Sequence, residues 1–173
     1  MYARNARLPD AFAIEQLIQV HVGDGTLLPR SLSEICENIR DFVVIEHEGE
    51  IVGCGALHLY GMHLAEVRSI TITNKAKGKG AGRILIDALM AEAKKQSVTC
   101  VCLFTRIPEF FGKLGFHAVE KEALPDKIHK DCLKCPRLHA CDEIAMYRGI
   151  LPRHLPRGNF RPTPKELVQI ATV

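Results

Sequence analysis

A basic, glycine-rich loop is the part of this sequence best suited to hold a phosphate group. Residues 77–83 read KGKGAGR, with glycine at every second position, and glycine lacks the Cβ atom that would keep a ligand away from the backbone. The amphipathic run that follows offers free N–H groups and the positive end of a helix dipole. The loop therefore predicts a phosphate-bearing cofactor, and a flexible basic turn is the alternative. The residues expected to bind that cofactor are Lys77, Gly78, Lys79, Gly80, Ala81, Gly82 and Arg83.

Two opposite charges stand on the run 64–72, which leads into that loop. Strand side chains alternate with a period of two, so Glu66 and Arg68 would share a face with Ile70 and Ile72. Charged and apolar side chains on one face indicate either the wall of a cleft or a β-bulge that reverses the facing midway. A solvated Glu66 paired with Arg68 is the simpler alternative.

Three of the seven cysteines form a local cluster, Cys132-x2-Cys135-x5-Cys141, and His139 lies within it. A C-x2-C pair is a common zinc half-site, and three thiolates with one histidine could complete a tetrahedron. The usual second half of a zinc pattern is missing, so unliganded or redox-active thiols, cluster chemistry and a disulfide stay open. The other cysteines lie in apolar stretches and are expected to pack as small buried hydrophobes: Cys36, Cys54, Cys100 and Cys102.

Length and composition favour one globular domain. The chain has 173 residues, of which 47% are hydrophobic and 25% charged, and a net charge of +3. That charge is too small to indicate a nucleic-acid partner, and no apolar run approaches the roughly 20 residues of a membrane span. An odd cysteine count without an export signal predicts a reducing, cytoplasmic setting.

The elements around the loop are expected to include both strands and helices. Strands are expected at 2–8, 42–47, 51–59, 64–72, 98–105, 116–120 and 142–148, and helices begin near 10, 31, 83 and 108. Strand, helix and strand across 64–105 form a βαβ unit, so its two strands should be parallel. Residues 123–140 are expected to be irregular.

The run ITITNKAKGKGAGRILIDALM resembles the acetyl-coenzyme A loop of the general amine N-acetyltransferase (GNAT) superfamily. The pattern Q/R-x-x-G-x-G/A falls on Lys77, Gly80 and Gly82, with lysine where arginine or glutamine is usual. The resemblance covers residues 1–148 and implies an α+β domain whose mixed, mostly antiparallel sheet has one parallel pair and is flanked by helices. It also implies acetyl-coenzyme A as co-substrate. The basic, proline-containing tail 149–173 lies outside it.

Further segments are similar to the short, stand-alone N-acetylglutamate synthases. They are GCGALH at 53–58, LAEVRSITI at 64–72, TRIPEFFGKLGF at 105–116 and LPDKIHKDCLKCPRLHACDEIAM at 124–146. The last contains a cysteine-bearing segment, 124–141, hereafter the insert. The resemblance implies direct acetyl transfer in a ternary complex to the α-amine of L-glutamate, the first step of arginine biosynthesis. Small-molecule substrates are the expected partners, without nucleic acid or membrane, and a homodimer is left open.

The resemblance also suggests roles for individual residues. Glu66 is the candidate general base, because a glutamate amine is mostly protonated at pH 7. A dicarboxylate acceptor needs cations, and arginine can bind a carboxylate through two parallel hydrogen bonds. The candidates are Arg30, Arg68 and Arg106. GNAT enzymes carry a bulge in the signature strand that frees N–H groups for the thioester oxygen, here expected around Ile70, Thr71 and Ile72.

The acid that protonates the leaving thiolate is a gap in the resemblance. Many GNAT enzymes use a tyrosine on the short helix after the buried strand, but here that helix reads PEFFGKLGF. Thr105 could position a water for this step, or the thiolate could leave without a dedicated acid.

Two other functions stay open from the sequence. A GNAT enzyme could acetylate another amino acid or a small amine, although a cationic acceptor would fit poorly with three arginines. A non-catalytic acetyl-coenzyme A-binding or metal-sensing module would use the cysteines as its sensor.

Overall fold

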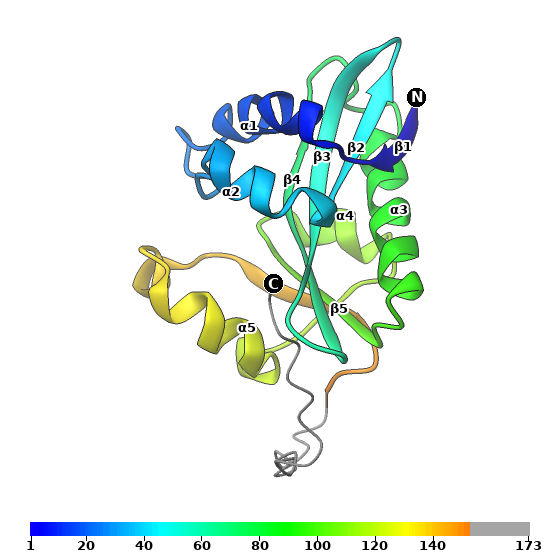
Figure 1. Ribbon diagram of the computed structural model, residues 1–173. Helices are drawn as coiled ribbons and strands as arrows, with labels where there is room; N and C mark the ends of the chain where they lie inside the picture. The colour runs from blue at the N-terminus through cyan, green and yellow to red at the C-terminus, as the bar shows by residue number, and fades with distance from the viewer. Residues whose placement is uncertain (153–173) are drawn as a thin grey trace, which may run out of the picture.

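The computed structural model describes residues 1–152, which are built around one seven-stranded sheet (Figure 1). The strands lie in the order β1-β2-β3-β4-β5-β7-β6, and only β4 and β5 are parallel neighbours. This confirms the mixed, mostly antiparallel sheet expected from the sequence. The strands are β1 (Tyr2–Asn5), β2 (Phe42–His47), β3 (Glu50–Leu59), β4 (Leu64–Ile72), β5 (Cys100–Thr105), β6 (His117–Ala118) and β7 (Ile144–Gly149).

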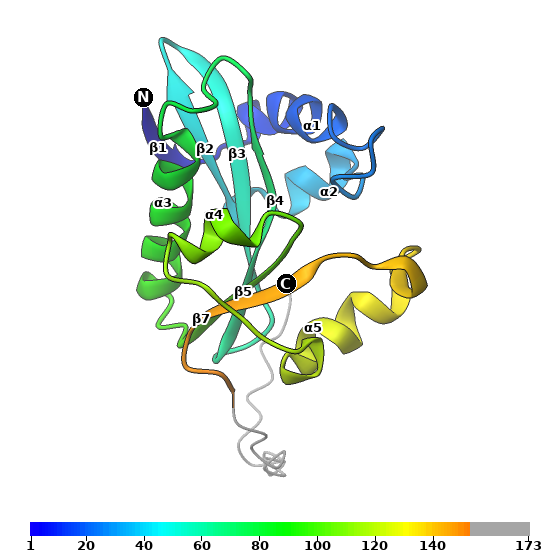
Figure 2. The same cartoon turned by 180° about the vertical axis from the view of Figure 1, so that it is seen from behind.

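Helices cover both faces of this sheet. On one face lie α3 (Ala81–Lys95) and α4 (Pro108–Gly112), and on the other lie α1 (Ala11–Gln19) and α2 (Leu32–Glu37) (Figures 1 and 2). Their apolar faces explain the arrangement: Leu85 and Leu89 of α3 belong to one buried core, whereas Ile14 and Ile18 of α1 belong to another.

The insert contains a helix that the sequence reading missed, α5 (Pro125–Lys130). Proline is well tolerated in the first turn of a helix, so Pro125 begins α5 rather than interrupting it. Leu124 anchors the start of α5 in a third apolar cluster, which includes Leu64 and Cys102. The expectation of an irregular 123–140 is therefore wrong for α5. A 3-10 turn at Lys121–Ala123 precedes α5, and two more follow it at Cys132–Lys134 and Leu138–Ala140.

A β-bulge in β4 reverses the facing of its side chains. Ala56 of β3 pairs with Arg68 and Cys54 pairs with Thr71, so β4 has one more residue than β3 over this interval. Ser69, in the extra step, has a φ of +54°.

Because of the bulge, apolar residues before and after it point to the same face of the sheet. Val67 before it and Ile70 and Ile72 after it pack in the core beneath α3. Glu66 and Arg68 therefore face away from that core, which confirms the bulge rather than an uninterrupted alternation.

β4 and β5 separate soon after they meet. Their parallel pairing runs from Leu64–Cys100 to Glu66–Cys102, while β4 continues to Ile72 and β5 to Thr105. β5 goes on pairing with β7 along its whole length. The sheet therefore opens at Glu66, between the two strands of the parallel pair.

Three of the four cysteines expected in the core are buried: Cys54, Cys100 and Cys102. Burial raises the pKa of the Cys54 thiol to about 12 and that of Cys100 to about 11. Cys36 is only half-buried.

Within residues 1–152, no helix is both long and apolar enough to cross a membrane. The expectation for the tail concerns 149–173, of which 153–173 lies outside the described residues.

Candidate active site

The glycine-rich loop connects β4 to α3 through a series of turns, as the sequence predicts. Gly78 and Gly80 have φ angles of +78° and +84°, a region that favours glycine. Gly82 has a steric reason instead, because an added Cβ would lie 3.0 Å from Phe110 Cζ.

The loop also has the charge and the donors that a phosphate needs. The first N–H groups of α3 have no acceptor within the helix, and they lie at the positive end of its dipole. The basic side chains of the loop are exposed: Lys77, Lys79 and Arg83. Binding of a phosphate by these residues stays a prediction.

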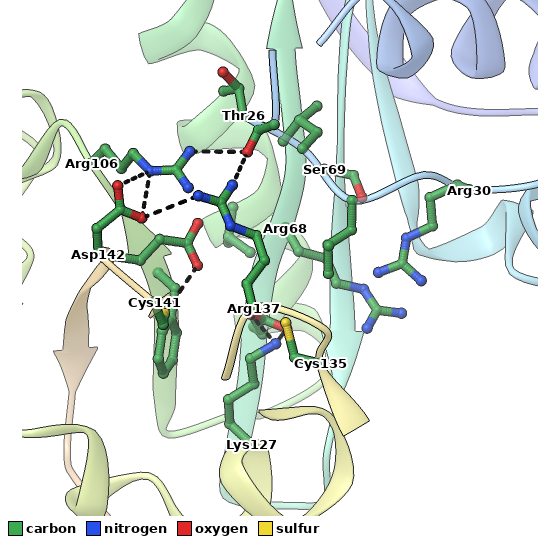
Figure 3. Close-up of a pocket in the computed structure, with 17 residues that line it drawn as sticks. Thr26, Arg30, Arg68, Ser69, Arg106, Lys127, Cys135, Arg137, Cys141 and Asp142 are labelled. Carbon is green, nitrogen blue, oxygen red and sulfur yellow. Dashed lines mark hydrogen bonds and ion pairs between the residues drawn. The ribbon is translucent and has the colours of Figure 1, made fainter. Parts of the chain in front are cut away.

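A charged pocket of about 130 Å³ lies where β4 and β5 separate (Figure 3). Its wall comes from β4, from the end of β5, from the loop between α1 and α2, and from the insert. The pocket thus brings together the three arginines chosen from the sequence and adds two further cations. Its basic residues are Arg30, Arg68, Arg106, Lys127 and Arg137, and its acidic residues are Glu66, Asp142 and Glu143.

Glu66 lies at the inner side of this pocket and is only 3% exposed. The Tyr60 hydroxyl donates a hydrogen bond to its Oε2 at 2.7 Å. Lys127 Nζ lies 2.8 Å from Oε1 and 3.0 Å from Oε2. The simpler alternative, a solvated Glu66 paired with Arg68, is therefore wrong: this carboxylate is buried and its cation comes from the insert.

Asp131, at the end of α5, extends this group of charges. Its Oδ2 lies 3.1 Å from Lys127 Nζ and 3.6 Å from Arg68 Nη1, and it also accepts a hydrogen bond from the Tyr60 hydroxyl. Burial raises the pKa of Asp131, but the hydrogen bond from Tyr60 and the charge of Lys127 outweigh burial and lower the pKa overall.

The pKa values of the two donors keep both of them protonated. Burial lowers the pKa of Lys127, but the charges of Glu66 and Asp131 outweigh burial and raise it. Burial and the charge of Glu66 hold the pKa of Tyr60 far above its ordinary range. Lys127 is therefore an ammonium and Tyr60 a neutral hydroxyl at neutral pH.

Arg106 follows β5 and faces Asp142, which precedes β7. Its Nε lies 2.8 Å from both carboxylate oxygens of Asp142, and its Nη1 donates to the Gly25 carbonyl at 3.2 Å. Arg137 of the insert also donates to the Gly25 carbonyl, and its Nη2 lies 3.8 Å from Asp142 (Figure 3). The α1–α2 loop and the insert are thus joined at the edge of the pocket.

Arg30 enters the pocket from the residue just before the cap of α2. The Ser31 hydroxyl accepts a hydrogen bond from the Glu34 N–H at 3.2 Å, which fixes the start of the helix. Arg30 pairs with the Glu34 carboxylate, one turn into α2. The cap thereby determines where this arginine leaves the backbone.

Thr105 has a local role in this structure. Its Oγ1 accepts a hydrogen bond from the Ile107 N–H at 3.0 Å, at the turn that leads into α4. Thr105 is not among the residues that line the charged pocket, so its part in protonating the thiolate gains no support. The N–H groups of Ile70, Thr71 and Ile72 follow the bulge, and their contact with a thioester oxygen stays a prediction.

The cysteine cluster does not form a metal site in the described part of the chain. Residues 1–152 contain no group of three or more histidine, cysteine, aspartate or glutamate side chains arranged to hold a metal ion. His139 is exposed, and the C-x2-C pair is closed into a 3-10 turn by a Cys135 N–H bond to the Cys132 carbonyl at 3.0 Å. The three thiols instead line a second cavity beside the charged pocket: Cys132, Cys135 and Cys141.

The sequence did not indicate the side chains that form hydrogen bonds and ion pairs with Glu66, Arg68 and Arg106. Lys127 and Asp131 stand four positions apart after Pro125, a spacing that predicts one face of a short helix. Tyr60 and Asp142 carried no such signal, because each meets its partner only through the fold.

The fold and the similarity to known proteins together define the chain as an N-acetyltransferase. An acetyltransferase (GNAT) domain family matches residues 38–118. An uncharacterized N-acetyltransferase of Chlorobaculum tepidum is 41% identical over 147 residues, covering 85% of this chain and 95% of that protein. The chain belongs to the GNAT family of N-acetyltransferases.

Two further relatives are amino-acid acetyltransferases. One, from Mycobacterium tuberculosis, is named an amino-acid acetyltransferase and is 35% identical over 120 residues, 68% of this chain and 68% of that protein. The other is an N-acetylglutamate synthase from Neisseria gonorrhoeae, solved with coenzyme A and N-acetyl-glutamate. It superposes with a TM-score of 0.77 at 25% identity, over 87% of this chain and 35% of the longer synthase.

Proposed function

We propose that this acetyltransferase transfers the acetyl group of acetyl-coenzyme A to the α-amine of L-glutamate. The observation that carries the proposal is the pocket at the opening between β4 and β5, which Arg30, Arg68 and Arg106 line together with Glu66. A dicarboxylate matches these cations, and an acceptor with a cationic side chain does not. Similarity to relatives named for amino-acid acetylation supports the same choice.

The reaction proposed is a direct transfer. The neutral amine nitrogen attacks the thioester carbonyl carbon, and a C–N bond forms while the carbonyl oxygen takes up negative charge. Backbone N–H groups after the bulge at Ser69 would donate to that oxygen. The C–S bond then breaks, coenzyme A leaves as a thiolate that takes a proton from solvent, and N-acetylglutamate remains.

Glu66 would accept the proton that the amine loses, directly or through one water. Glu66 lines the pocket. Tyr60 and Lys127 both donate hydrogen bonds to its carboxylate, as they would to the ionised form that a base requires. The glycine loop, between the end of β4 and the start of α3, would hold the pyrophosphate of the co-substrate. The product would enter arginine biosynthesis at its first step.

The experiment that tests this function follows thiol release from acetyl-coenzyme A with each of the standard amino acids in turn. Glutamate should give the highest kcat/KM, and the product should carry the acetyl group on the α-amine. Absence of release with both glutamate and glutamine would remove the proposed substrate, and a faster reaction with another amino acid would favour the rival GNAT activity.

A further inference from the structure

The ion pair between Glu66 and Lys127 joins β4 to the insert across 61 positions of the chain. The side chains are 4% and 14% exposed, so little solvent screens either charge. Two nearly buried charges are costly to remove from water, and an apolar pair of the same size is often as stable. Stability alone is therefore a weak reason for this pair.

Other titratable or charged groups also face Glu66. His58 of β3 lies opposite Glu66 in the register of β3 and β4. Its ring packs edge-on against the Tyr60 ring, with the two ring centroids 4.9 Å apart. Cys102 of β5 lies beside Glu66 in the parallel register of β4 and β5. From α5 and its end come Lys127 and Asp131. The remaining neighbours on this face are Tyr60, Arg68 and Cys132.

We propose that Lys127 is a positioning residue for acetyl transfer, whose ammonium fixes the Glu66 carboxylate in the pocket and keeps it ionised. The inference rests on the proposed role of Glu66 as base, and it makes the insert part of the catalytic centre. Lys127 acts through Glu66 and is not assigned contact with the acceptor.

The hydrogen-bond inventory shows why the ammonium is needed. The Tyr60 hydroxyl lies within bonding distance of both Glu66 and Asp131, but it has a single hydrogen and can donate to only one carboxylate at a time. Arg68 Nη1 reaches Asp131 at 3.6 Å. Without Lys127, two neighbouring carboxylates would share one hydroxyl and one distant cation, which favours the protonated form of one of them. Glu66 is the less exposed of the two, at 4% against 34% for Asp131, and the distant cation lies beside Asp131, so the proton is expected on Glu66. A protonated Glu66 cannot accept the proton of the amine.

The kinetic test compares Lys127→Met and Lys127→Gln with Lys127→Arg, which keeps the charge. At pH values below the shifted acid limb, both neutral variants should lower kcat and kcat/KM by about tenfold or more. The acid limb of their kcat/KM profile should move up by about one pH unit or more, so that activity recovers at high pH. KM for glutamate should stay within about twofold, and Lys127→Arg should restore most of kcat. Lys134→Met, an exposed lysine of the same insert, should leave the acid limb in place.

Two kinetic results would overturn the proposal. A loss of rate that is equal at every pH would show that Lys127 only supports the fold. A rise in KM for glutamate with kcat unchanged would show that Lys127 binds the acceptor instead.

A second measurement does not depend on which acceptor is correct. Carbon-13 NMR of the resting protein follows the Glu66 carboxyl through a pH titration, with Glu66→Gln used to assign the signal. In Lys127→Met and Lys127→Gln this signal should titrate at higher pH than in the parent protein, and in Lys127→Arg it should not. This difference would persist even if glutamate proves to be the wrong substrate, whereas an unmoved titration would overturn the proposal whatever the substrate.

Discussion

Arg106 is tied to its surroundings by a carboxylate that resembles the group it is proposed to bind. Both oxygens of Asp142 lie 2.8 Å from Arg106 Nε, and Asp142 is exposed. This pair holds the arginine at the mouth of the pocket, and its two terminal amino groups are left for other acceptors, one of which is the Gly25 carbonyl. At the scale of single residues, the site therefore depends on arginines oriented by neighbouring acceptors before any substrate arrives.

Replacing Arg106 with alanine should weaken acceptor binding selectively. Loss of a charge-assisted carboxylate contact is expected to raise KM for glutamate about tenfold or more, with KM for acetyl-coenzyme A nearly unchanged. Steady-state kinetics with each substrate varied in turn would measure this. Arg40→Ala, which removes an exposed arginine outside the pocket, is the matched control. Equal changes in both KM values would argue against a role for Arg106 in acceptor binding.

At the scale of elements, successive parts of β4 position different parts of the site. Its first part holds Glu66 and Arg68 toward the insert, the bulge at Ser69 reverses the facing, and its end leads into the glycine loop. One strand thus presents charged groups on one face and contributes isoleucines to the core on the other. The separation from β5 after Glu66 leaves room for the pocket between them.

The glycine loop can be tested at this scale through its backbone. Gly80 has a φ of +84° and an added Cβ would meet no atom within 4 Å, so Gly80→Ala introduces conformational strain and no clash. A left-handed alanine costs about 1–2 kcal/mol, which would distort the start of α3. KM for acetyl-coenzyme A should rise several-fold and KM for glutamate should not. Gly112→Ala in α4, where φ is not positive and no atom lies within 4 Å, should leave both values unchanged; a selective effect on glutamate from Gly80→Ala would contradict the loop's assignment.

At the scale of the whole molecule, local sequence patterns predict most of the elements, with α5 as an exception, but not the contacts between distant elements. The alternation of 64–72 and the glycine spacing predicted β4, its loop and α3, because these depend on neighbouring residues. The arginines that line the pocket were identified because arginine suits the expected chemistry. Lys127 was missed because its partner lies 61 positions away and only the position of the insert brings them together. The choice between a metal site and free thiols stayed open in the sequence for the same reason, since cysteine spacing along the chain does not fix where the thiols lie in the fold; residues 1–152 hold no group arranged to bind a metal ion.

The central claim is that the pocket selects an acceptor with an anionic side chain, and the comparison of glutamate with lysine tests it most directly. Both offer the same α-amine and α-carboxylate, but their side chains carry opposite charges toward a pocket with five basic and three acidic residues. The measurement is the ratio of kcat/KM for the two amino acids at saturating acetyl-coenzyme A. We expect a ratio of at least about 100 in favour of glutamate, because like charges placed together cost several kcal/mol. A ratio near one, or a preference for lysine, would contradict it.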